Sequence, residues 1–397
     1  MFDTVALAPP DPILGLAESF SKDSRKEKIN LTIGVYQDDS GRTPVLDCIK
    51  RAEHLLWESE QSKSYLSIEG MTTFRQHAFE LALGGLADFE HTAVVQTPGG
   101  TGALKVAADL LRRNFGPLRV WVSTPTWPNH CSLFESSGLE VKNYPYLSGN
   151  KRSLDYSAML TTIETEARQG DVLCLHGCCH NPSGIDPTPD QWHQIFELSA
   201  DKGMVPLIDF AYQGFGSGLE EDRECLRTIQ SYHNEYVVCS SFSKNFGLYS
   251  ERVGALMVVC SSQSHAANVS SGAKQVVRTN YSNPPRHGGA LIATVLTNPE
   301  LKSLWLTELT SMRERIGRMR EQFVHNMMAT GCDVDFSFLL KQRGMFSFSG
   351  LNPMQVDWLR NEKGIYIVGN GRINVAGMTP SNLPVLTAAV AECLKNC

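Results

Sequence analysis

The 397-residue sequence has no long apolar run, no block of like charges, no internal repeat and no low-complexity segment. Without a long apolar run, no membrane-spanning helix is expected, and the first ten residues lack the basic region of a secretory signal. A net charge of −6 without basic clusters does not suggest nucleic acid or an anionic membrane as a partner. Eleven cysteines, an odd number in so long a chain, do not form a disulfide framework and fit the reducing cytoplasm.

The composition is that of an ordinary globular protein, with 42% apolar and 20% charged residues. A chain of this length is too large for one simple core, so two domains are expected. From about residue 92, strand patterns alternate with helix patterns, which is typical of an α/β domain with a largely parallel sheet. The last part of the chain is smaller and mixes short strands with helices.

The pattern also predicts how the chain divides. Residues 1–13 are rich in proline and are expected to form an extended arm. Residues 29–36 alternate as a strand, a helix is expected over 44–58, and a long solvated helix over 298–328 links the two domains. We predict a large domain over 46–312 and a small domain over 14–45 and 313–397.

One stretch between two apolar strand patterns carries the clearest chemistry. It contains two hydroxyls, a lysine and an arginine, at Ser241, Ser243, Lys244 and Arg252. A lysine that follows an apolar strand loses hydration, which favours its neutral, nucleophilic form. Hydroxyls and an arginine nearby suit a phosphate dianion. A Schiff-base lysine beside a phosphate site is what pyridoxal 5'-phosphate (PLP) requires; the alternative is a basic surface loop.

Other polar residues end strands of the same predicted sheet. Asp209 ends an apolar strand, where a carboxylate needs a cationic partner such as a protonated pyridine nitrogen. Asn181, Tyr212 and Ser241 also follow strands. Because open α/β sheets bind ligands at the carboxyl ends of their strands, these four residues are expected to share one site.

Two further features favour a phosphate and a planar ring. Gly100 and Thr101 lie in a glycine-rich turn (98–102) before a helix predicted over 103–112, where free N–H groups attract an anion, although the spacing is not that of a P-loop or a dinucleotide fingerprint. Trp127 lies between two prolines on a rigid loop, which suits stacking against a pyridine ring. The alternative for Trp127 is ordinary packing.

The segment Cys174–His180 offers a different interpretation, because it holds three cysteines and two histidines. These residue types bind zinc, but a strand sends alternate side chains to opposite faces, and no C-x-x-C pair completes a tetrahedron. We therefore predict no metal site and expect the cysteines to pack as small apolar residues.

The motifs together resemble a known family. Ser241-Phe242-Ser243-Lys244, followed eight residues after the lysine by Arg252-Val253-Gly254, resembles the coenzyme-lysine signature of class I aminotransferases. The resemblance is to the aspartate/aromatic amino acid aminotransferase subfamily and covers nearly the whole chain. It implies PLP-dependent transferase fold type I, in which a mostly parallel seven-stranded sheet flanked by helices forms the large domain, beside a smaller α+β domain.

The resemblance implies a role for each matching residue. Lys244 would bind the coenzyme and move a proton, Asp209 would keep the pyridine nitrogen protonated, and Tyr212 with Asn181 would bind the phenolic oxygen. His130 would orient the aspartate, and Trp127 would stack on the ring. The phosphate would be held by Gly100, Thr101, Ser241, Ser243 and Arg252, with Tyr65 from a partner subunit; for Tyr65, the alternative is a half-buried loop aromatic.

The resemblance also implies how substrate is bound. Arg372 would pair with the α-carboxylate, and Arg278 would reach from the other subunit of a homodimer to a dicarboxylate side chain. Gly34, Trp127 and Asn181 would also contact the substrate. Without the resemblance, Arg278 would be interpreted as a solvated surface charge.

We therefore predict a cytoplasmic, homodimeric aminotransferase. It would move the amino group between aromatic amino acids (Phe, Tyr, Trp) or aspartate and 2-oxoglutarate, alternating between the pyridoxal and pyridoxamine forms of its coenzyme in a ping-pong reaction. Val35, Thr43 and Asn283 look more like the aspartate enzymes of the subfamily, so a strict aspartate aminotransferase is the alternative. A PLP-dependent lyase or decarboxylase and a PLP-sensing regulator are the other classes considered.

Overall fold

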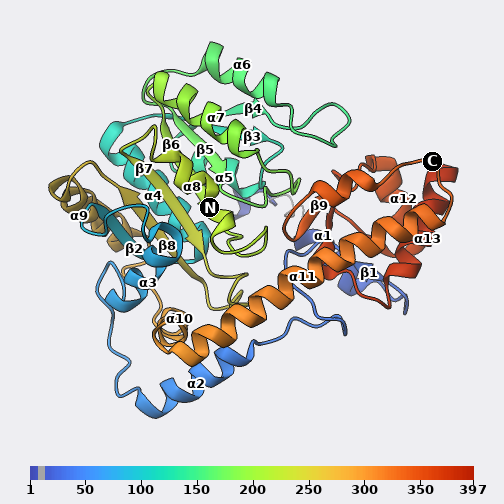
Figure 1. Ribbon diagram of the computed structural model, residues 1–397, viewed down its shortest axis with the longest axis horizontal. Helices are drawn as coiled ribbons and strands as arrows, with labels where there is room; N and C mark the ends of the chain where they lie inside the picture. Colours follow the sequence, from blue (N-terminus) through green and yellow to red (C-terminus); the bar gives the residue numbers. More distant parts are fainter. Residues whose placement is uncertain (8–13) are drawn as a thin grey trace. The chain divides into compact units, whose positions relative to one another are not determined.

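The protein divides into two compact units in a computed structural model that describes residues 1–7 and 14–397 (Figure 1). The larger unit contains residues 44–314 and 342–344, and the smaller unit contains the remaining described segments. The predicted α/β class is confirmed. The domain limits given above stay a prediction. None of the helices in the described part of the chain combines the length and apolar composition needed to cross a membrane.

The larger unit is built on a seven-stranded sheet with the order β2-β8-β7-β6-β5-β3-β4. β8 runs antiparallel to both neighbours, and the other pairs are parallel, so the predicted mostly parallel sheet is confirmed. The strands are β2 (Thr92–Pro98), β3 (Arg119–Thr124), β4 (Glu140–Pro145), β5 (Val172–His176), β6 (Val205–Phe210), β7 (Tyr236–Ser241) and β8 (Val253–Val259).

Helices cover this sheet (Figure 1). α4 packs over β7 and β8, α9 packs on β2 and α4, and α7 packs on β6. The helices are α2 (Asp47–Ser59), α3 (Thr72–Leu83), α4 (Gly99–Phe115), α5 (Asn129–Ser136), α6 (Tyr156–Glu166), α7 (Pro189–Asp201), α8 (Glu224–Ile229), α9 (Gln263–Asn280) and α10 (His287–Thr297). α7 begins with a capping box, in which Thr188 and Gln191 bond each other's backbone.

Alternate residues of the strands form the core between the sheet and helices α4, α5 and α9. On β5 these residues are Val172 and Cys174, and on β7 they are Val237 and Cys239. Cys174 and Cys239 therefore pack as small apolar side chains, as predicted for Cys174. Because the strand period is two, the next residues of the same series, at the carboxyl ends of the strands, face the same way. Those residues are polar, and they begin the site described below.

The smaller unit is an α+β arrangement around two short sheets. In one, β1 (Ile29–Asn30) pairs in parallel with β10 (Ile365–Tyr366), and in the other, β9 (Phe346–Phe348) pairs antiparallel with β11 (Arg372–Asn374). Its helices include α1 (Leu14–Lys22), α12 (Pro353–Lys363) and α13 (Leu383–Asn396). α12 begins with an Asn352–Gln355 capping box and ends at Gly364, which adopts the left-handed conformation.

The long predicted helix is α11 (Pro299–Ala329), and the division between the two units falls inside it, after Glu314. It is not solvated on all sides, because apolar side chains at helical spacing are buried along its length. These side chains are Leu301, Trp305, Leu309, Met312, Ile316, Met319, Phe323 and Met327. The helix is therefore an element with one buried face, and the expected solvated helix is corrected to that extent.

Other expected elements differ in extent. The strand predicted over 29–36 is limited to β1, because the carbonyl groups beyond Leu31 bond side chains instead of a neighbouring strand. The helix predicted from residue 44 begins at Asp47. In the predicted arm, residues 2–4 form a 3-10 turn, and residues 8–13 lie outside the described residues.

Candidate active site

The site lies where β5, β6 and β7 end, at the carboxyl edge of the parallel strands. On β6 the inward-facing series continues from Leu207 to Asp209, and on β7 it continues from Cys239 to Ser241. Both polar side chains are buried. Burying a polar group costs free energy unless it has a partner, so polar residues at this edge indicate a functional site rather than core packing.

Lys244 follows β7 and is the central residue of this edge. Its ammonium group lies 4.6 Å from the centre of the Tyr212 ring. Burial lowers the pKa of Lys244 to about 8, a shift that nearby Asp209 opposes and Arg252 reinforces. An amine with this pKa is partly neutral near physiological pH, so it can act as a nucleophile and as a base.

Asp209 is held by His130 of α5. His130 Nε2 lies 2.9 Å from Asp209 Oδ2, and His130 Nδ1 lies 2.8 Å from Thr126 Oγ1. Burial acts to raise the pKa of Asp209, but the hydrogen bond from His130 and nearby positive charge outweigh it, so the pKa is lowered. The buried carboxylate is therefore an anion, and it suits a cationic partner.

Aromatic and imidazole rings surround this pair. The Trp127 ring lies 5.3 Å from the His130 ring in an edge-to-face arrangement, and the His176 ring lies 5.1 Å from it. His176 ends β5 and continues the inward series of Val172 and Cys174. Its Nε2 has no hydrogen-bond partner among the described residues. Burial lowers the pKa of His176 well below its ordinary value, so the ring is neutral.

A group of polar and backbone donors at the start of α4 forms a second part of the site. Ser241 Oγ lies 3.3 Å from Ser243 Oγ, which in turn accepts a hydrogen bond from Arg252 Nη1 at 3.3 Å. A Cβ added to Gly100 would lie 2.9 Å from Ser241 Cβ, so the helix N-terminus approaches these side chains closely. No side chain of the described residues caps α4, and its first N–H groups remain available to an anion.

Two features of the backbone maintain this approach. Arg252 has a φ of 53°, in the left-handed region that non-glycine residues rarely adopt, and such positions concentrate at functional sites. Gly254 of β8 lies against the backbone of Gly99 and Gly100, and an added Cβ would overlap the Gly99 carbonyl. Glycine at position 254 therefore permits the close packing of β8 on the start of α4.

Asn181 and Tyr212 complete the buried polar set. Asn181 Nδ2 donates to Tyr212 Oη at 3.4 Å, and both side chains are buried. Asn181 follows β5 and Tyr212 follows β6. The two strand ends thus bring an amide and a phenol together, as the strand-edge argument predicts.

Tyr65 and Arg278 belong to the same unit but lie at its surface. Tyr65 is 92% exposed. Arg278, in the last turn of α9, is exposed and donates to Ser282. Both are therefore side chains that project from this chain rather than residues of its buried polar set.

In the smaller unit, Arg372 and Gly34 meet at Phe346. The Arg372 guanidinium carbon lies 4.2 Å from the centre of the Phe346 ring, and Nη2 donates to Thr32 O at 2.5 Å. A Cβ added to Gly34 would lie 2.7 Å from Phe346 Cζ, so a side chain at this position would displace the ring. The two residues, separated by more than three hundred positions in sequence, thus share one neighbour.

Comparison with known proteins identifies the family of the chain. Residues 26–390 match the family model described as aminotransferase class I and II. The chain belongs to this family.

Individual aminotransferases resemble it over their whole length. An aspartate aminotransferase of Escherichia coli (strain K12) is 51% identical over 99% of this chain and 100% of its own length. An aromatic-amino-acid aminotransferase of Pseudomonas aeruginosa is 43% identical over 98% of both chains. The crystal structure of an aromatic-amino-acid aminotransferase from Burkholderia pseudomallei, covalently bound to pyridoxal phosphate, matches with a TM-score of 0.96, 44% identity and 99% coverage of both chains. The predicted family resemblance and enzyme class are confirmed.

Two groups in the described residues have the composition of a metal site. One consists of His130, His176 and Asp209, and the other consists of Cys178, Cys179 and Asp222. In the second group, Asp222 accepts hydrogen bonds from three backbone N–H groups, and burial raises the pKa of Cys178 well above its ordinary value, which favours the thiol. These features favour the prediction of no metal, which elemental analysis of the purified protein for zinc can test.

Three residues that lie beside predicted site residues of their own unit have no place in the predicted site: Phe346 and Asn374 in the smaller unit and His176 in the larger unit. Phe346 and Asn374 are short-strand residues of an aminotransferase small unit and have no distinctive local pattern. His176 enters the sequence-based predictions only as a candidate zinc ligand, although its place in the period-two series of β5 predicts the direction of its side chain. For His176 that signal was present in the sequence, whereas Phe346 required the paired strands to be known.

Proposed function

We propose that this protein is a PLP-dependent aminotransferase that moves amino groups between aspartate or aromatic amino acids and 2-oxoglutarate. The observation that carries the proposal is Lys244, a buried amine with its pKa lowered to about 8, next to the Tyr212 ring and the anion of Asp209. This combination suits a lysine that forms a Schiff base, and it would be costly in a purely structural core.

The residues present fit the coenzyme at each of its polar groups. The Asp209 carboxylate suits a protonated pyridine nitrogen. The uncapped start of α4, with Gly100 and Thr101, suits a phosphate, and so do the hydroxyls and the guanidinium beside it. We assign the phosphate to Gly100, Thr101, Ser241, Ser243 and Arg252. Asn181 and Tyr212 suit the phenolic oxygen, and Trp127 suits the face of the ring.

When bound, PLP supplies an aldehyde that condenses with an amine and a ring that takes up electrons released at the substrate Cα. Lys244 Nζ would first be the nucleophile that holds the coenzyme; once the substrate amine has taken its place on the aldehyde carbon, the released Lys244 amine would be the base that removes the Cα proton. Asp209 stays ionised and stabilises positive charge at the pyridine nitrogen, and His130 holds Asp209 in place. Asn181 and Tyr212 stabilise negative charge at the phenolic oxygen.

Arg372 would bind the α-carboxylate of the substrate. A planar guanidinium pairs with a carboxylate through two hydrogen bonds, and this pairing fixes which Cα bond stands perpendicular to the ring. Gly34, which lies against the same Phe346 ring, would leave room for the substrate beside Arg372. Trp127 and Asn181 would also contact the substrate.

Tyr65 and Arg278 would act in a second copy of the chain. Both project from the surface of the larger unit, which suits residues that reach a neighbouring site. Tyr65 would bind the partner's coenzyme phosphate, and Arg278 would bind a dicarboxylate side chain. The active enzyme would then be a homodimer, and we expect it in the cytoplasm.

A strict aspartate aminotransferase is the second candidate. It is favoured by the relatives, because the aspartate aminotransferase of E. coli is more similar to this chain than the aromatic enzyme of P. aeruginosa. Arg278 is compatible with both candidates. A guanidinium at the end of an exposed helix turn can pair with a dicarboxylate or rotate away from an aromatic ring.

The first experiment is the visible absorption spectrum of the purified protein, recorded before and after adding aspartate and, separately, phenylalanine. If both amino acids remove the band of the lysine-bound coenzyme, the broad function is supported. If aspartate alone removes it, the enzyme is a strict aspartate aminotransferase. If excess PLP gives no such band, the coenzyme assignment is wrong. The Lys244→Ala variant should fold but lose transamination, and near-native turnover would contradict the role of Lys244.

A further inference from the structure

The segment from Thr32 to Arg42 of the smaller unit is held mainly by side chains, together with one backbone hydrogen bond from Gln37 N to Ala376 O at 3.1 Å. Asn374 Nδ2 donates to Ile33 O at 2.7 Å and to Val35 O at 2.9 Å. Gly34, assigned above to the substrate site, lies between these two carbonyl groups. Its position is therefore set by the contacts that hold its neighbours, because among the described residues no strand pairing continues past β1.

The following turn, residues 38–42, is closed by its own hydrogen bonds. Asp38 Oδ1 accepts from the backbone N–H groups of Ser40 and Arg42 and from Ser40 Oγ. Asp38 N also donates to Arg42 O at 2.8 Å. The turn is thus held together by its own hydrogen bonds. A contact that fixes the turn in place therefore also limits the movement of residues 32–37, which precede it.

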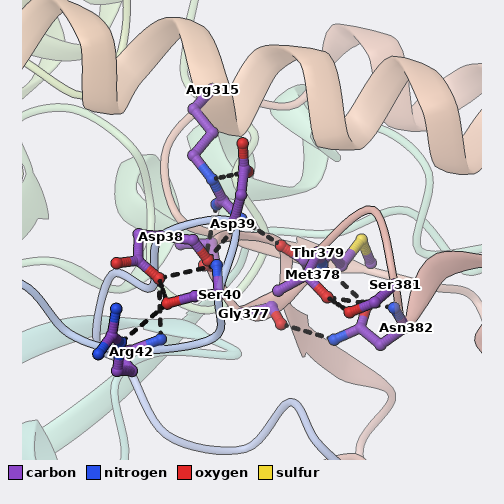
Figure 2. Close-up of polar contacts among 11 residues, drawn as sticks. Asp38, Asp39, Ser40, Arg42, Arg315, Gly377, Met378, Thr379, Ser381 and Asn382 are labelled. Carbon is purple, nitrogen blue, oxygen red and sulfur yellow. Dashed lines mark hydrogen bonds and ion pairs between the residues drawn. The ribbon is translucent and has the colours of Figure 1, made fainter.

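Arg315 of α11 is the anchor. Its Nε donates to Asp39 Oδ1 at 2.7 Å, and its Nη2 donates to Asp38 O at 3.0 Å and to Met378 O at 2.8 Å (Figure 2). The Arg315 side chain is 5% exposed, whereas that of Asp39 is 65% exposed. One buried guanidinium therefore joins the turn, the helix and the segment around Met378.

The guanidinium also covers Tyr36, at a distance of 5.5 Å from its carbon to the ring centre. The segment around Met378 is itself well defined, because Asn382 donates to Gly377 O and accepts from Thr379 N. Figure 2 shows Arg315 pointing from α11 toward the turn on one side and toward this segment on the other. Arg315 thus connects two segments that are each held by their own hydrogen bonds, the turn at 38–42 and the segment around Met378.

From these contacts we infer that Arg315 is a positioning residue for substrate binding. It sets the place of the turn at 38–42, and through Tyr36 and Val35 it sets the place of Gly34 relative to Arg372. The inference rests on the proposed function, because it assumes that Gly34 and Arg372 meet the substrate. Arg315 would not touch the substrate; its loss would lower the fraction of protein in which the binding groups are correctly placed.

The test compares Arg315→Met and Arg315→Lys with a matched control in the full-length, PLP-loaded enzyme. Arg25→Met is the control, since Arg25 also joins one carboxylate (Asp23) to two backbone carbonyl groups (Arg360 and Asn361) of the smaller unit. We expect Arg315→Met to raise the KM for the amino acid about tenfold, with kcat changed less than about twofold. Arg315→Lys should give an intermediate KM, because it keeps the charge but not the planar set of donors.

Two readouts separate positioning from a general loss of stability. Amide hydrogen exchange of the peptide covering residues 33–42 should accelerate in Arg315→Met and stay unchanged in Arg25→Met. The coenzyme band should be retained in every variant, whereas its absence from the parent protein would overturn the proposed function itself. An unchanged KM in Arg315→Met, or an equal rise in Arg25→Met, would overturn the inference. If Arg315→Met does not fold, Arg315→Lys decides the question: a raised KM with faster amide hydrogen exchange over residues 33–42 would support the inference, and unchanged values would overturn it.

Discussion

His130 donates from Nε2 to the Asp209 carboxylate at 2.9 Å, while its Nδ1 lies 2.8 Å from the Thr126 hydroxyl. Since a carboxylate only accepts, Nε2 carries the proton, and Nδ1 of a neutral ring accepts from Thr126. The carboxylate therefore requires the proton on Nε2, and the Thr126 hydroxyl, which can donate or accept, pairs with the other ring nitrogen. The buried Asp209 carboxylate at the end of β6 is therefore held by two residues outside that strand, His130 and Thr126.

The His130→Asn variant tests the hydrogen bond between His130 and Asp209. Without the hydrogen bond, the pKa of Asp209 should rise, because burial then acts with less opposition. We expect kcat to fall about tenfold with KM little changed, as for other residues that orient a functional group. Steady-state kinetics across pH 5–9 would measure both. A fall in kcat equal to that of Asp209→Asn would show that His130 does more than orient.

Lys244 should make the stability of the coenzyme-free protein depend on pH. Burial lowers its pKa from 10.5 to about 8, so between these values the unfolded chain binds more protons than the folded one. Stability should therefore rise with pH across this window. At pH 7 the buried ammonium costs about 3 kcal/mol, at about 1.4 kcal/mol per pKa unit.

The Lys244→Met variant removes this term. Urea unfolding of the two coenzyme-free proteins at pH 7, 8, 9 and 10 should show Lys244→Met more stable at pH 7, with the difference shrinking toward pH 10. The same slope in both proteins would mean that Lys244 is not the group responsible.

Asp186 should give the opposite dependence at lower pH. Burial raises its pKa from 3.8 to about 6, although the N–H groups of Cys179 and His180 partly compensate. In this window the folded protein binds more protons than the unfolded chain, so stability should fall as pH rises from 4 to 6. In Asp186→Asn this contribution is absent, and its stability relative to the parent should increase across the window. Thermal unfolding at half-unit pH steps would measure it, and a constant difference would argue against the raised pKa.

Gly254→Ala should weaken coenzyme binding. The new methyl group would overlap the Gly99 carbonyl and lie 2.8 Å from Gly100 N, so the start of α4 must move away from Ser241. We expect the affinity for PLP to fall at least about tenfold, measured by fluorescence titration of the coenzyme-free protein. Gly317→Ala is the control: none of the described residues has an atom within 4 Å of its added Cβ in α11, so it should leave PLP affinity unchanged and add up to about 1 kcal/mol of stability.

Much of the larger unit follows from local sequence patterns. Alternation of strand and helix patterns predicts the sheet, and the rule that ligands gather at strand ends predicts that Asp209, Asn181 and Tyr212 lie together. These predictions succeed because the strands are long, apolar and regularly spaced. β8 also appeared in the pattern, but its antiparallel direction depends on pairing with β2 and β7 and has no local signature.

The smaller unit was less predictable for a physical reason. Residues 29–36 alternate like a strand, yet Asn374 and Arg372 satisfy carbonyl groups that a neighbouring strand would otherwise bond. Those donors lie more than three hundred residues away, so no window of sequence contains them. The sequence pattern likewise places Arg315 in a solvated helix, because its acceptors lie on two segments that are distant in sequence.

The antiparallel direction of β8 has a consequence for how the protein folds. Because β8 returns directly along β7, the chain reaches Ser241, Lys244, Arg252 and Gly254 without a crossover helix. A short loop costs little closure entropy, and local contacts generally form faster than distant ones. We expect the β7–β8 pair to be an early structure on the folding pathway. The proposed phosphate-binding side chains of this loop would then be ordered before the segment at residues 31–35, whose partners in β11 lie more than three hundred residues away in sequence.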